Sequence, residues 1–246
     1  MGRKIRLDRL LVDRGLAPSR HRARELIEAG DVLVDGHPAT KVAAQVDSAR
    51  TVALRATEHQ WVSRGAHKLL GVLEPFGVDS AGAVCADLGA STGGFTEVLL
   101  HRGAARVYAI DVGRAQLHER VANDARVVVM DGVNVRHLEA LPEPCDLLVA
   151  DLSFISVTKV LPAMGRLLRP GGRAVILVKP QFEVGRQHIA SGGRVRDELA
   201  RSEAIEAVAA ACRGAGFEVR GSMDSPVAGA RSGNVEHFLH LVRQAG

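Results

Sequence analysis

The sequence predicts an α/β protein, in which a Rossmann-like, mostly parallel seven-stranded sheet follows a small α+β unit. From residue 65 onward, near-continuous apolar runs alternate with helical stretches, which is typical of a parallel sheet covered on both faces. Before residue 55, two short helical patterns lead into a hairpin. The length of 246 residues, 46% of them hydrophobic, suits one medium domain and a small one.

The N-terminal segment predicts a compact unit of two helices and a hairpin. Three leucines lie on one face of the first helix, over residues 6–14: Leu7, Leu10 and Leu11. Ser19 is placed as the N-cap of a second helix, which ends at Gly30. Asp35 and Gly36 then form a tight turn between alternating strands, and the segment TVALR adds a further strand.

Positive charge is concentrated near the N-terminus. Lys and Arg total 32 against 28 acidic residues, and the sequence pI is about 9.3. Residues 1–24 alone hold eight Lys or Arg against two acids, Asp8 and Asp13. A surface that is merely solvated would spread this charge more evenly, so a polyanion, namely nucleic acid, is the favoured partner.

Composition disfavours several protein classes. The isolated Cys85, Cys145 and Cys212 suggest neither a disulfide framework nor a zinc site, which fits a reducing cytosol. None of the ten His forms a metal-ligand pair with supporting carboxylates, so we expect no metal. No apolar run reaches the ~18 residues of a membrane span, and no apolar signal core follows the basic N-terminus, so we expect a cytoplasmic protein.

The N-terminal unit resembles the S-four-type RNA-binding domain over about residues 6–54, where SRHRARELIEAGDVLVDG matches the core segment of that family. The resemblance implies binding to structured RNA through the basic helix face. Because the unit contains no aromatic residue, phosphate and shape contacts are left rather than base stacking. We expect RNA contacts from six basic residues: Arg3, Lys4, Arg6, Arg20, Arg22 and Arg64.

Three segments are therefore predicted: an RNA-binding domain over residues 1–55, a linker over 56–64, and the sheet domain over 65–246. The linker carries Trp61, the only tryptophan. Packing between the two domains is the favoured role for Trp61, and contact with ligand or RNA is the alternative.

A glycine-rich turn follows the first strand of the predicted sheet. It leaves backbone N–H groups at the positive end of the next helix, with Ser91 where a dinucleotide fold has its second glycine. That glycine lets a pyrophosphate approach the backbone, so its absence argues against NAD and a dehydrogenase. The carboxylate-bearing tail of S-adenosylmethionine can still use the turn. The residues expected to bind it are Gly89, Ala90, Ser91, Thr92, Gly93 and Gly94.

Two carboxylates follow the next strands along the chain. Asp111 ends the second strand, where a carboxylate can accept from both hydroxyls of a ribose. Asp131 ends the third strand, near the expected position of adenine. Capping of the following loops is the alternative role for each of them.

Four polar residues are the candidates for chemistry: Lys68, Asp151, Lys179 and Glu236. Asp151 follows LLVA and Lys179 follows VILV, so both lie at C-terminal strand ends, the edge where open α/β sheets bind ligands. Lysines and carboxylates are usually solvated at the surface. These two interrupt apolar segments and therefore need partners. Two lysines and two carboxylates together can handle the proton of an alcohol.

From Trp61 onward the chain resembles the FtsJ-type 2′-O-ribose methyltransferases, in the segments WVSRGAHKL, DLGASTGGFTEVLL, ADLSFIS, VKPQFEVG and SGNVEHFL. With its N-terminal unit it is similar to the TlyA family, whose members also carry the name haemolysin. The resemblance implies a class I methyltransferase fold, S-adenosylmethionine as cofactor, and cytidine 2′-O-methylation of ribosomal RNA (16S and/or 23S), free or within ribosomal subunits. It assigns catalysis to the four polar residues, and cofactor binding to the glycine turn and Asp111. One departure is His59, which replaces an arginine in the linker.

Several alternatives stay open at this point. Lys179 is the candidate base, although neighbouring carboxylates favour a protonated lysine and the four groups can titrate as a unit. Residues 182–197 are either a mobile flap, with Arg186, Arg194 and Arg196 reaching RNA phosphate, or an ordinary solvated loop. A non-catalytic RNA-binding or ribosome-assembly factor is one rival function, which cofactor binding would test. A membrane-lytic protein is another, which liposome leakage would test.

Overall fold

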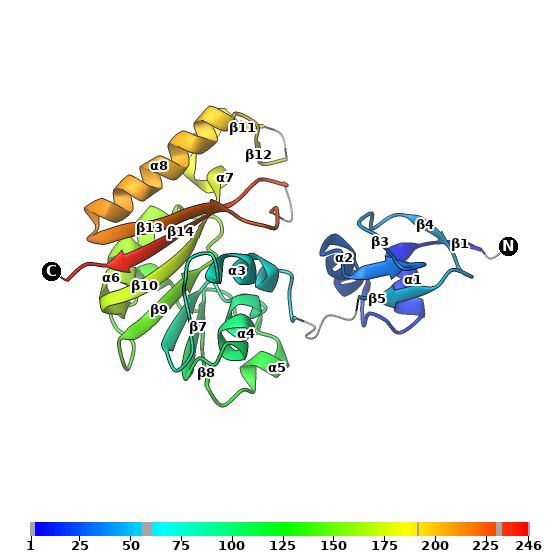
Figure 1. The fold of residues 1–246 in the computed structure, drawn as a ribbon, viewed down its shortest axis with the longest axis horizontal. Helices are drawn as coiled ribbons and strands as arrows, with labels where there is room; N and C mark the ends of the chain where they lie inside the picture. The colour runs from blue at the N-terminus through cyan, green and yellow to red at the C-terminus, as the bar shows by residue number, and fades with distance from the viewer. Residues whose placement is uncertain (1–2, 56–60, 191, 230–232, 246) are drawn as a thin grey trace. The chain divides into compact units, whose positions relative to one another are not determined.

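The computed structural model describes residues 3–55, 61–190, 192–229 and 233–245. The chain divides into two compact units, Met1–Arg64 and Gly65–Gly246, each of which is described by itself (Figure 1). Within the described residues, no helix has the length and apolar character that crossing a bilayer requires. His59 lies outside the described residues, so its effect on the linker stays a prediction.

The smaller unit combines two helices with short strands in its described residues. In chain order its elements are β1 (Lys4–Arg6), α1 (Leu7–Asp13), α2 (Arg20–Glu28), β2 (Val32–Val34), β3 (His37–Pro38), β4 (Gln45–Asp47) and β5 (Val52–Leu54). Strand β1 pairs with β4, and β2 lies between β3 and β5. The predicted helices and hairpin are present, and so is the further strand predicted from TVALR, which is β5. The pairing of β1 with β4 was not predicted.

Local signals in the sequence explain the smaller unit. The leucines predicted to share a helix face are all buried: Leu7, Leu10 and Leu11. The Ser19 hydroxyl accepts from the Arg22 N–H at 3.2 Å, so Ser19 caps α2 as expected. Asp35 and Gly36 adopt φ values of +49° and +83°, the left-handed pair that a tight hairpin turn requires.

The larger unit alternates strands and helices. Its elements are α3 (Gly65–Leu73), β6 (Val84–Leu88), α4 (Gly94–His101), β7 (Arg106–Asp111), α5 (Glu119–Ala122), β8 (Val127–Asp131), η1 (Val135–His137), β9 (Cys145–Ala150), η2 (Val157–Val160), α6 (Leu161–Leu167), β10 (Leu168–Val178), α7 (Pro180–Glu183), η3 (Arg186–His188), β11 (Ile189–Ala190), β12 (Arg194–Val195), α8 (Glu198–Gly214), β13 (Phe217–Asp224) and β14 (His237–Arg243). Helix α3 ends at Leu73, two residues before Pro75, which has no N–H to donate to a further helical turn.

The described residues of this unit form a seven-stranded sheet in the order β13-β14-β10-β9-β6-β7-β8. Strand β14 runs antiparallel to β10 and β13, and the other pairings are parallel. The chain leaves β6 toward β7 and later crosses back to β9 on the other side of β6. This reversal between β6 and β9 is the point at which open α/β sheets bind ligands.

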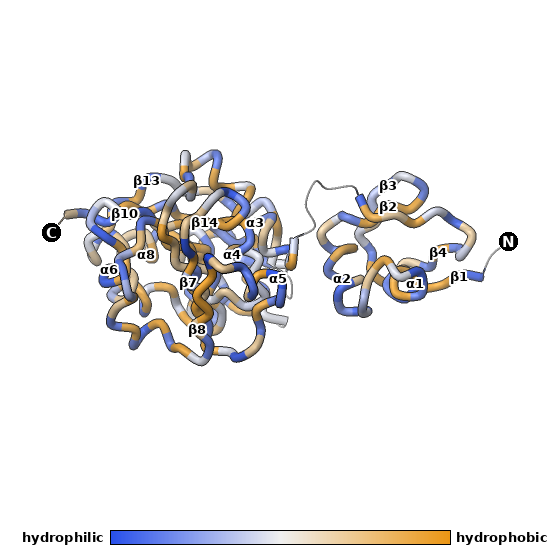
Figure 2. Tube along the Cα trace, turned by 90° about the horizontal axis from the view of Figure 1, so that it is seen from below, coloured by the Kyte–Doolittle hydropathy of each residue, from blue (hydrophilic) through white to orange (hydrophobic). Residues whose placement is uncertain are grey.

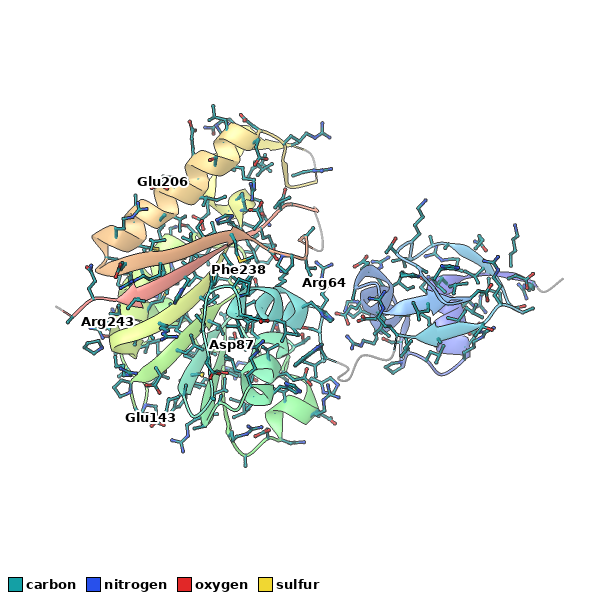
Figure 3. The ribbon with its side chains drawn as sticks, viewed as in Figure 1. Arg64, Asp87, Glu143, Glu206, Phe238 and Arg243 are labelled. Atoms are coloured by element: carbon teal, nitrogen blue, oxygen red, sulfur yellow. The ribbon has the colours of Figure 1, made fainter. Side chains whose placement is uncertain are left out.

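Helices cover both faces of the sheet (Figure 1). Successive residues of a strand point to opposite faces, so Leu239 of β14 packs with α6 and α8 while Phe238 stacks on Phe95 of α4 at 6.3 Å (Figure 3). The edge strand β8 is apolar (Figure 2), and Val128 and Val129 are partly exposed along it. Because helices cover both faces, most of the sheet is shielded from water. Polar side chains buried there require hydrogen-bond or ion-pair partners.

Candidate active site

The four polar residues predicted to act together lie side by side in the structure. The Lys68 Nζ donates to Glu236 Oε2 at 2.6 Å and lies 3.6 Å from Asp151 Oδ2. The Lys179 Nζ lies 2.6 Å from Asp151 Oδ1. The groups form a continuous row, Glu236–Lys68–Asp151–Lys179, in which positive and negative charges alternate.

This cluster is largely removed from water. The side chains of Lys68 and Glu236 are 7% and 3% exposed, and that of Asp151 is 20% exposed. Burial alone would raise the pKa of Asp151, but the ammonium groups of Lys68 and Lys179 outweigh it and lower that pKa. Asp151 therefore stays an anion between two lysines, and each charge in the row has an opposite neighbour.

Each member of the row is held by a different element. Lys68 lies on the buried face of α3, Asp151 follows β9, Lys179 stands between β10 and α7, and Glu236 precedes β14. The Asp151 N–H donates to the Leu88 carbonyl of β6 at 3.0 Å, which continues the sheet pairing to the carboxylate. Strand ends placed at the same edge thus bring together residues that are far apart in the sequence.

Two glycines let the segment before β14 pack closely on this cluster. A Cβ on Gly71 of α3 would lie 2.5 Å from Pro226, so the bare backbone of α3 accommodates that proline. A Cβ on Gly229 would lie 2.9 Å from Glu236 Oε1. The Glu236 carboxylate is thereby confined between Gly229 and the ammonium of Lys68.

Sequence reasoning missed two consecutive residues that follow β9, Ser153 and Phe154. The Lys179 Nζ donates to Ser153 Oγ at 2.7 Å, which adds a hydroxyl to the row of charges. Phe154 is 78% exposed, adopts φ +65°, and lies 5.4 Å from the ring of Phe182. A positive φ is unfavourable for a bulky residue and is concentrated at functional sites. Strain of this kind has no signature in the sequence.

The glycine turn lies at the same edge, between β6 and α4. Gly89, Ser91 and Gly93 adopt φ values of +85°, +47° and +94°, so the turn depends on left-handed backbone at three positions. A Cβ on Gly89 would lie 2.8 Å from the Asp151 carbonyl oxygen, which is backbone and cannot move aside. The turn and the row of four polar residues therefore touch directly through Gly89.

The predicted cofactor acids flank a loop beyond the turn. Asp111 accepts from the N–H groups of Ser91 and Gly113 at 2.9 and 2.7 Å, and Asp131 accepts from that of Ala115 at 2.7 Å. Each carboxylate oxygen has two lone pairs, so ribose hydroxyls can still be accepted. Val112, which directly follows Asp111, is 73% exposed and offers an apolar surface for a flat ring. This set of donors and acceptors fits an uncharged nucleoside better than a pyrophosphate.

A third carboxyl near the turn was not predicted. Asp87 of β6 is fully buried, and its Oδ2 accepts from the Thr96 hydroxyl at 2.7 Å (Figure 3). Its Oδ1 has no hydrogen-bond partner among the described residues. Burial raises the pKa of Asp87 to about 7, more than the Thr96 bond lowers it. Asp87 therefore carries a proton under mildly acidic conditions, close to Asp151, whose pKa is lowered.

The predicted RNA contacts are only partly available as free cations. Arg6 and Arg20 both donate to Asp8, and the Arg6 bond and the charge of Arg20 hold the pKa of that carboxyl far below its ordinary range. Arg22 donates to the carbonyls of Trp61 and Val62 at 2.6 and 3.2 Å. Arg22 thus ties α2 to the second half of the linker, which is a structural role that the sequence did not reveal.

The remaining basic candidates differ in exposure. Arg3 and Lys4 are exposed. The Arg64 side chain is 15% exposed and lies 3.8 Å from Glu28 (Figure 3). RNA binding by all six stays a prediction, and Arg3, Lys4 and Arg20 are the exposed members.

The segment 182–197, expected to be a flap or a loop, has regular structure in its described residues. It contains η3 and the antiparallel pair β11–β12. The Asn234 side chain accepts from the Val195 N–H at 3.0 Å and donates to the Gly193 carbonyl at 2.9 Å. The hairpin is therefore attached to the segment that leads to Glu236, while the side chain of Arg186 lies outside the described part of the chain.

Comparison with known protein families agrees with this arrangement. The model of the FtsJ-like methyltransferase family matches residues 61–243, and that of the S4 domain matches residues 5–52. The 16S/23S rRNA (cytidine-2′-O)-methyltransferase TlyA of Mycobacterium tuberculosis is 51% identical to this chain, over 99% of this chain and 92% of its own length. The chain belongs to the TlyA family of FtsJ-like methyltransferases.

Solved structures support the TlyA-family fold. A haemolysin-named protein from Streptococcus thermophilus is 37% identical, with a TM-score of 0.77 over 100% of this chain and 90% of its own. An S-adenosylmethionine-dependent methyltransferase from Listeria monocytogenes is only 14% identical, yet it covers 74% of this chain and 99% of its own with a TM-score of 0.56. The latter likeness concerns the fold alone. This TlyA-family member is thus a methyltransferase, and its fold is that of the predicted class.

Proposed function

We propose that this TlyA-family member transfers the methyl group of S-adenosylmethionine to the 2′-hydroxyl of a cytidine in ribosomal RNA, in the 16S molecule, the 23S molecule or both. The observation that carries the proposal is the buried row Glu236–Lys68–Asp151–Lys179, which touches the glycine turn through Gly89. The identity to the Mycobacterium tuberculosis enzyme supports the choice of cytidine and of ribosomal RNA. A cytoplasmic location follows from that substrate.

The residues proposed to hold the cofactor are those of the glycine turn, Gly89–Gly94, with Asp111 for the ribose hydroxyls and Asp131 near the adenine. When bound, S-adenosylmethionine supplies a methyl group on a positively charged sulfur, which needs no acid to activate it. Held there, it would offer that methyl group to the oxygen of the RNA hydroxyl, and the hydroxyl proton would pass to the protein. The protein must therefore align the hydroxyl and accept one proton.

Lys179 is the proposed proton acceptor. Lys68 lies between two carboxylates, Glu236 and Asp151, and forms an ion pair with each. Lys179 has one carboxylate neighbour and the hydroxyl of Ser153. Lys68 and Glu236 then orient Asp151, and Asp151 orients Lys179. The acceptor is the neutral amine, so Lys179 gives up its own proton to solvent before the transfer. Taking the hydroxyl proton then forms the ammonium that pairs with Asp151.

The experiment that tests the function is methylation of ribosomal subunits that lack 2′-O-methylcytidine, with the purified chain and labelled S-adenosylmethionine. We expect label in ribosomal RNA and a new 2′-O-methylcytidine when the RNA is mapped. Binding of S-adenosylmethionine and RNA without transfer would instead support a non-catalytic RNA-binding factor. Leakage from liposomes without transfer would support a lytic protein.

A further inference from the structure

A pocket of about 410 Å³ lies beside the catalytic row, between the hairpin β11–β12, the start of α8 and the segment before β14. Arg194 and Arg196 line it from the hairpin, and Glu198 and Arg201 line it from α8. We infer that this pocket binds a phosphodiester of the substrate RNA close to the methylated ribose. The inference rests on the proposed function and adds a contact site to it.

Position links the pocket to the chemistry. Pro180, which lines the pocket, directly follows Lys179, and Asn234, which also lines it, precedes Glu236 by two residues. Two residues of extended chain span at most about 7 Å. A ligand in the pocket therefore lies next to two members of the row. Strand β12 of the hairpin packs against α7, which begins directly after Lys179, and against α8 (Figure 1).

The charge available to a ligand comes from two arginines. The Arg201 guanidinium lies 2.7 Å from Glu198 and also pairs with Asp224, and its side chain is 13% exposed. Arg194 and Arg196 are exposed, and neither forms an ion pair with an acid among the described residues. Two free guanidinium groups facing one pocket favour a doubly hydrogen-bonded anion such as phosphate.

The backbone N–H groups at the start of α8 are not free to bind an anion in the pocket. Asp197 caps this helix and accepts from the N–H groups of Leu199 and Ala200 at 3.0 and 3.2 Å. A ligand anion would compete with that carboxylate. Anion binding in the pocket therefore depends on Arg194 and Arg196.

The wall that carries these arginines is prearranged. Asn234 is buried, and its amide holds both Gly193 and Val195 of the hairpin. The same backbone segment continues to Glu236, so the hairpin has a fixed position relative to the catalytic carboxylate. Phosphate contacts carry little sequence information but fix the register of a nucleic acid on a protein. Here they would set which ribose reaches Lys179.

The test is the double variant Arg194→Gln/Arg196→Gln, measured on ribosomal subunits. We expect the KM for the subunits to rise at least fivefold, while kcat and the Kd for S-adenosylmethionine change less than twofold. The slope of log Kd for an RNA fragment against log salt should fall by about 1 for each arginine that no longer meets a phosphate. The matched control is Arg213→Gln/Arg220→Gln, which removes the same charge from exposed arginines of α8 and β13 outside the pocket lining.

The outcomes separate the two proposals. An unchanged KM and salt slope, equal to those of the control, would overturn the pocket. So would a fall in kcat with KM unaltered, since that pattern indicates a role in the chemical step. If the wild-type chain methylates no ribosomal RNA, the proposed function fails, whereas the RNA titration still tests the pocket without turnover.

Discussion

The ion pair between Lys68 and Glu236 allows a quantitative prediction, because Lys68 has a second counter-charge nearby and Glu236 does not. Among the described residues, Glu236 has Lys68 as its one ion-pair partner, at 2.6 Å, whereas Lys68 also has Asp151 at 3.6 Å. Lys68→Met leaves a carboxylate that is 3% exposed without a counter-charge. Removing one partner of a buried pair costs about 3–5 kcal/mol, so we expect that loss in the free energy of unfolding.

Glu236→Gln should cost less. The amide oxygen still accepts from Lys68, and Asp151 still balances its charge, so we expect about 1.5–3 kcal/mol, the range of a hydrogen bond to a charged group. The double variant leaves neither charge unpaired at this position. It should therefore be more stable than the sum of the single losses predicts, by about 2 kcal/mol or more.

Guanidinium unfolding followed by circular dichroism measures these free energies for the wild type, both single variants and the double variant. All four proteins share the same N-terminal unit, so differences between them report on the larger unit. Losses that simply add would refute the coupling. Equal losses of unfolding free energy for Lys68→Met and Glu236→Gln would refute the argument that Asp151 still balances Lys68 when Glu236 is neutral.

Three further changes have defined outcomes. Gly89→Ala should weaken S-adenosylmethionine binding, measured by calorimetry, at least tenfold, because the added Cβ would lie 2.8 Å from the Asp151 carbonyl oxygen. The control is Gly77→Ala, at φ +59° with no atom within 4 Å of the added Cβ, which should leave binding unchanged. Lys179→Ala should abolish methyl transfer with the cofactor Kd within about threefold of the wild type, and retained transfer would exclude Lys179 as the acceptor. Because burial raises the pKa of Asp87 from its unfolded value to about 7, the folded state binds the extra proton between pH 4 and 7, so stability should fall as pH rises through that window. Asp87→Asn should flatten this dependence, and an unchanged slope in urea unfolding against pH would contradict the assignment.

Much of the fold could be predicted because the larger unit follows simple periodicity. The five strands that pair in parallel, β6 to β10, contain apolar runs that end in or are followed by a polar residue or a glycine. The described residues between β13 and β14 contain no helix, and strands joined without a crossover helix can pair antiparallel, as these two do. By contrast, β1 and β4 are three residues each and pair only through long-range contact, such as Ile5 with Val46. Segments that short carry no periodicity of their own.

The candidate site was predicted as a set of residues but not as a network. The sequence placed Asp151 and Lys179 at strand ends, and the family resemblance supplied Lys68 and Glu236. The roles of Ser153 and Asp87 were missed, because a hydroxyl or a carboxyl in an apolar segment gives no sign of which side chain it meets. The capture of Arg22 by the linker backbone was missed for the same reason.

The direction of β14 has a consequence for how this site can be assembled. In a parallel strand, a residue that precedes the strand lies at the opposite edge of the sheet from one that follows it. Seven residues of strand, the length of His237–Arg243, would separate them by about 20 Å. Reversal of this one strand brings its entry to the edge where β9 and β10 exit. Glu236 can therefore face Lys68 only because β14 is antiparallel to β10. A parallel β14 would leave Lys68 with a single carboxylate neighbour.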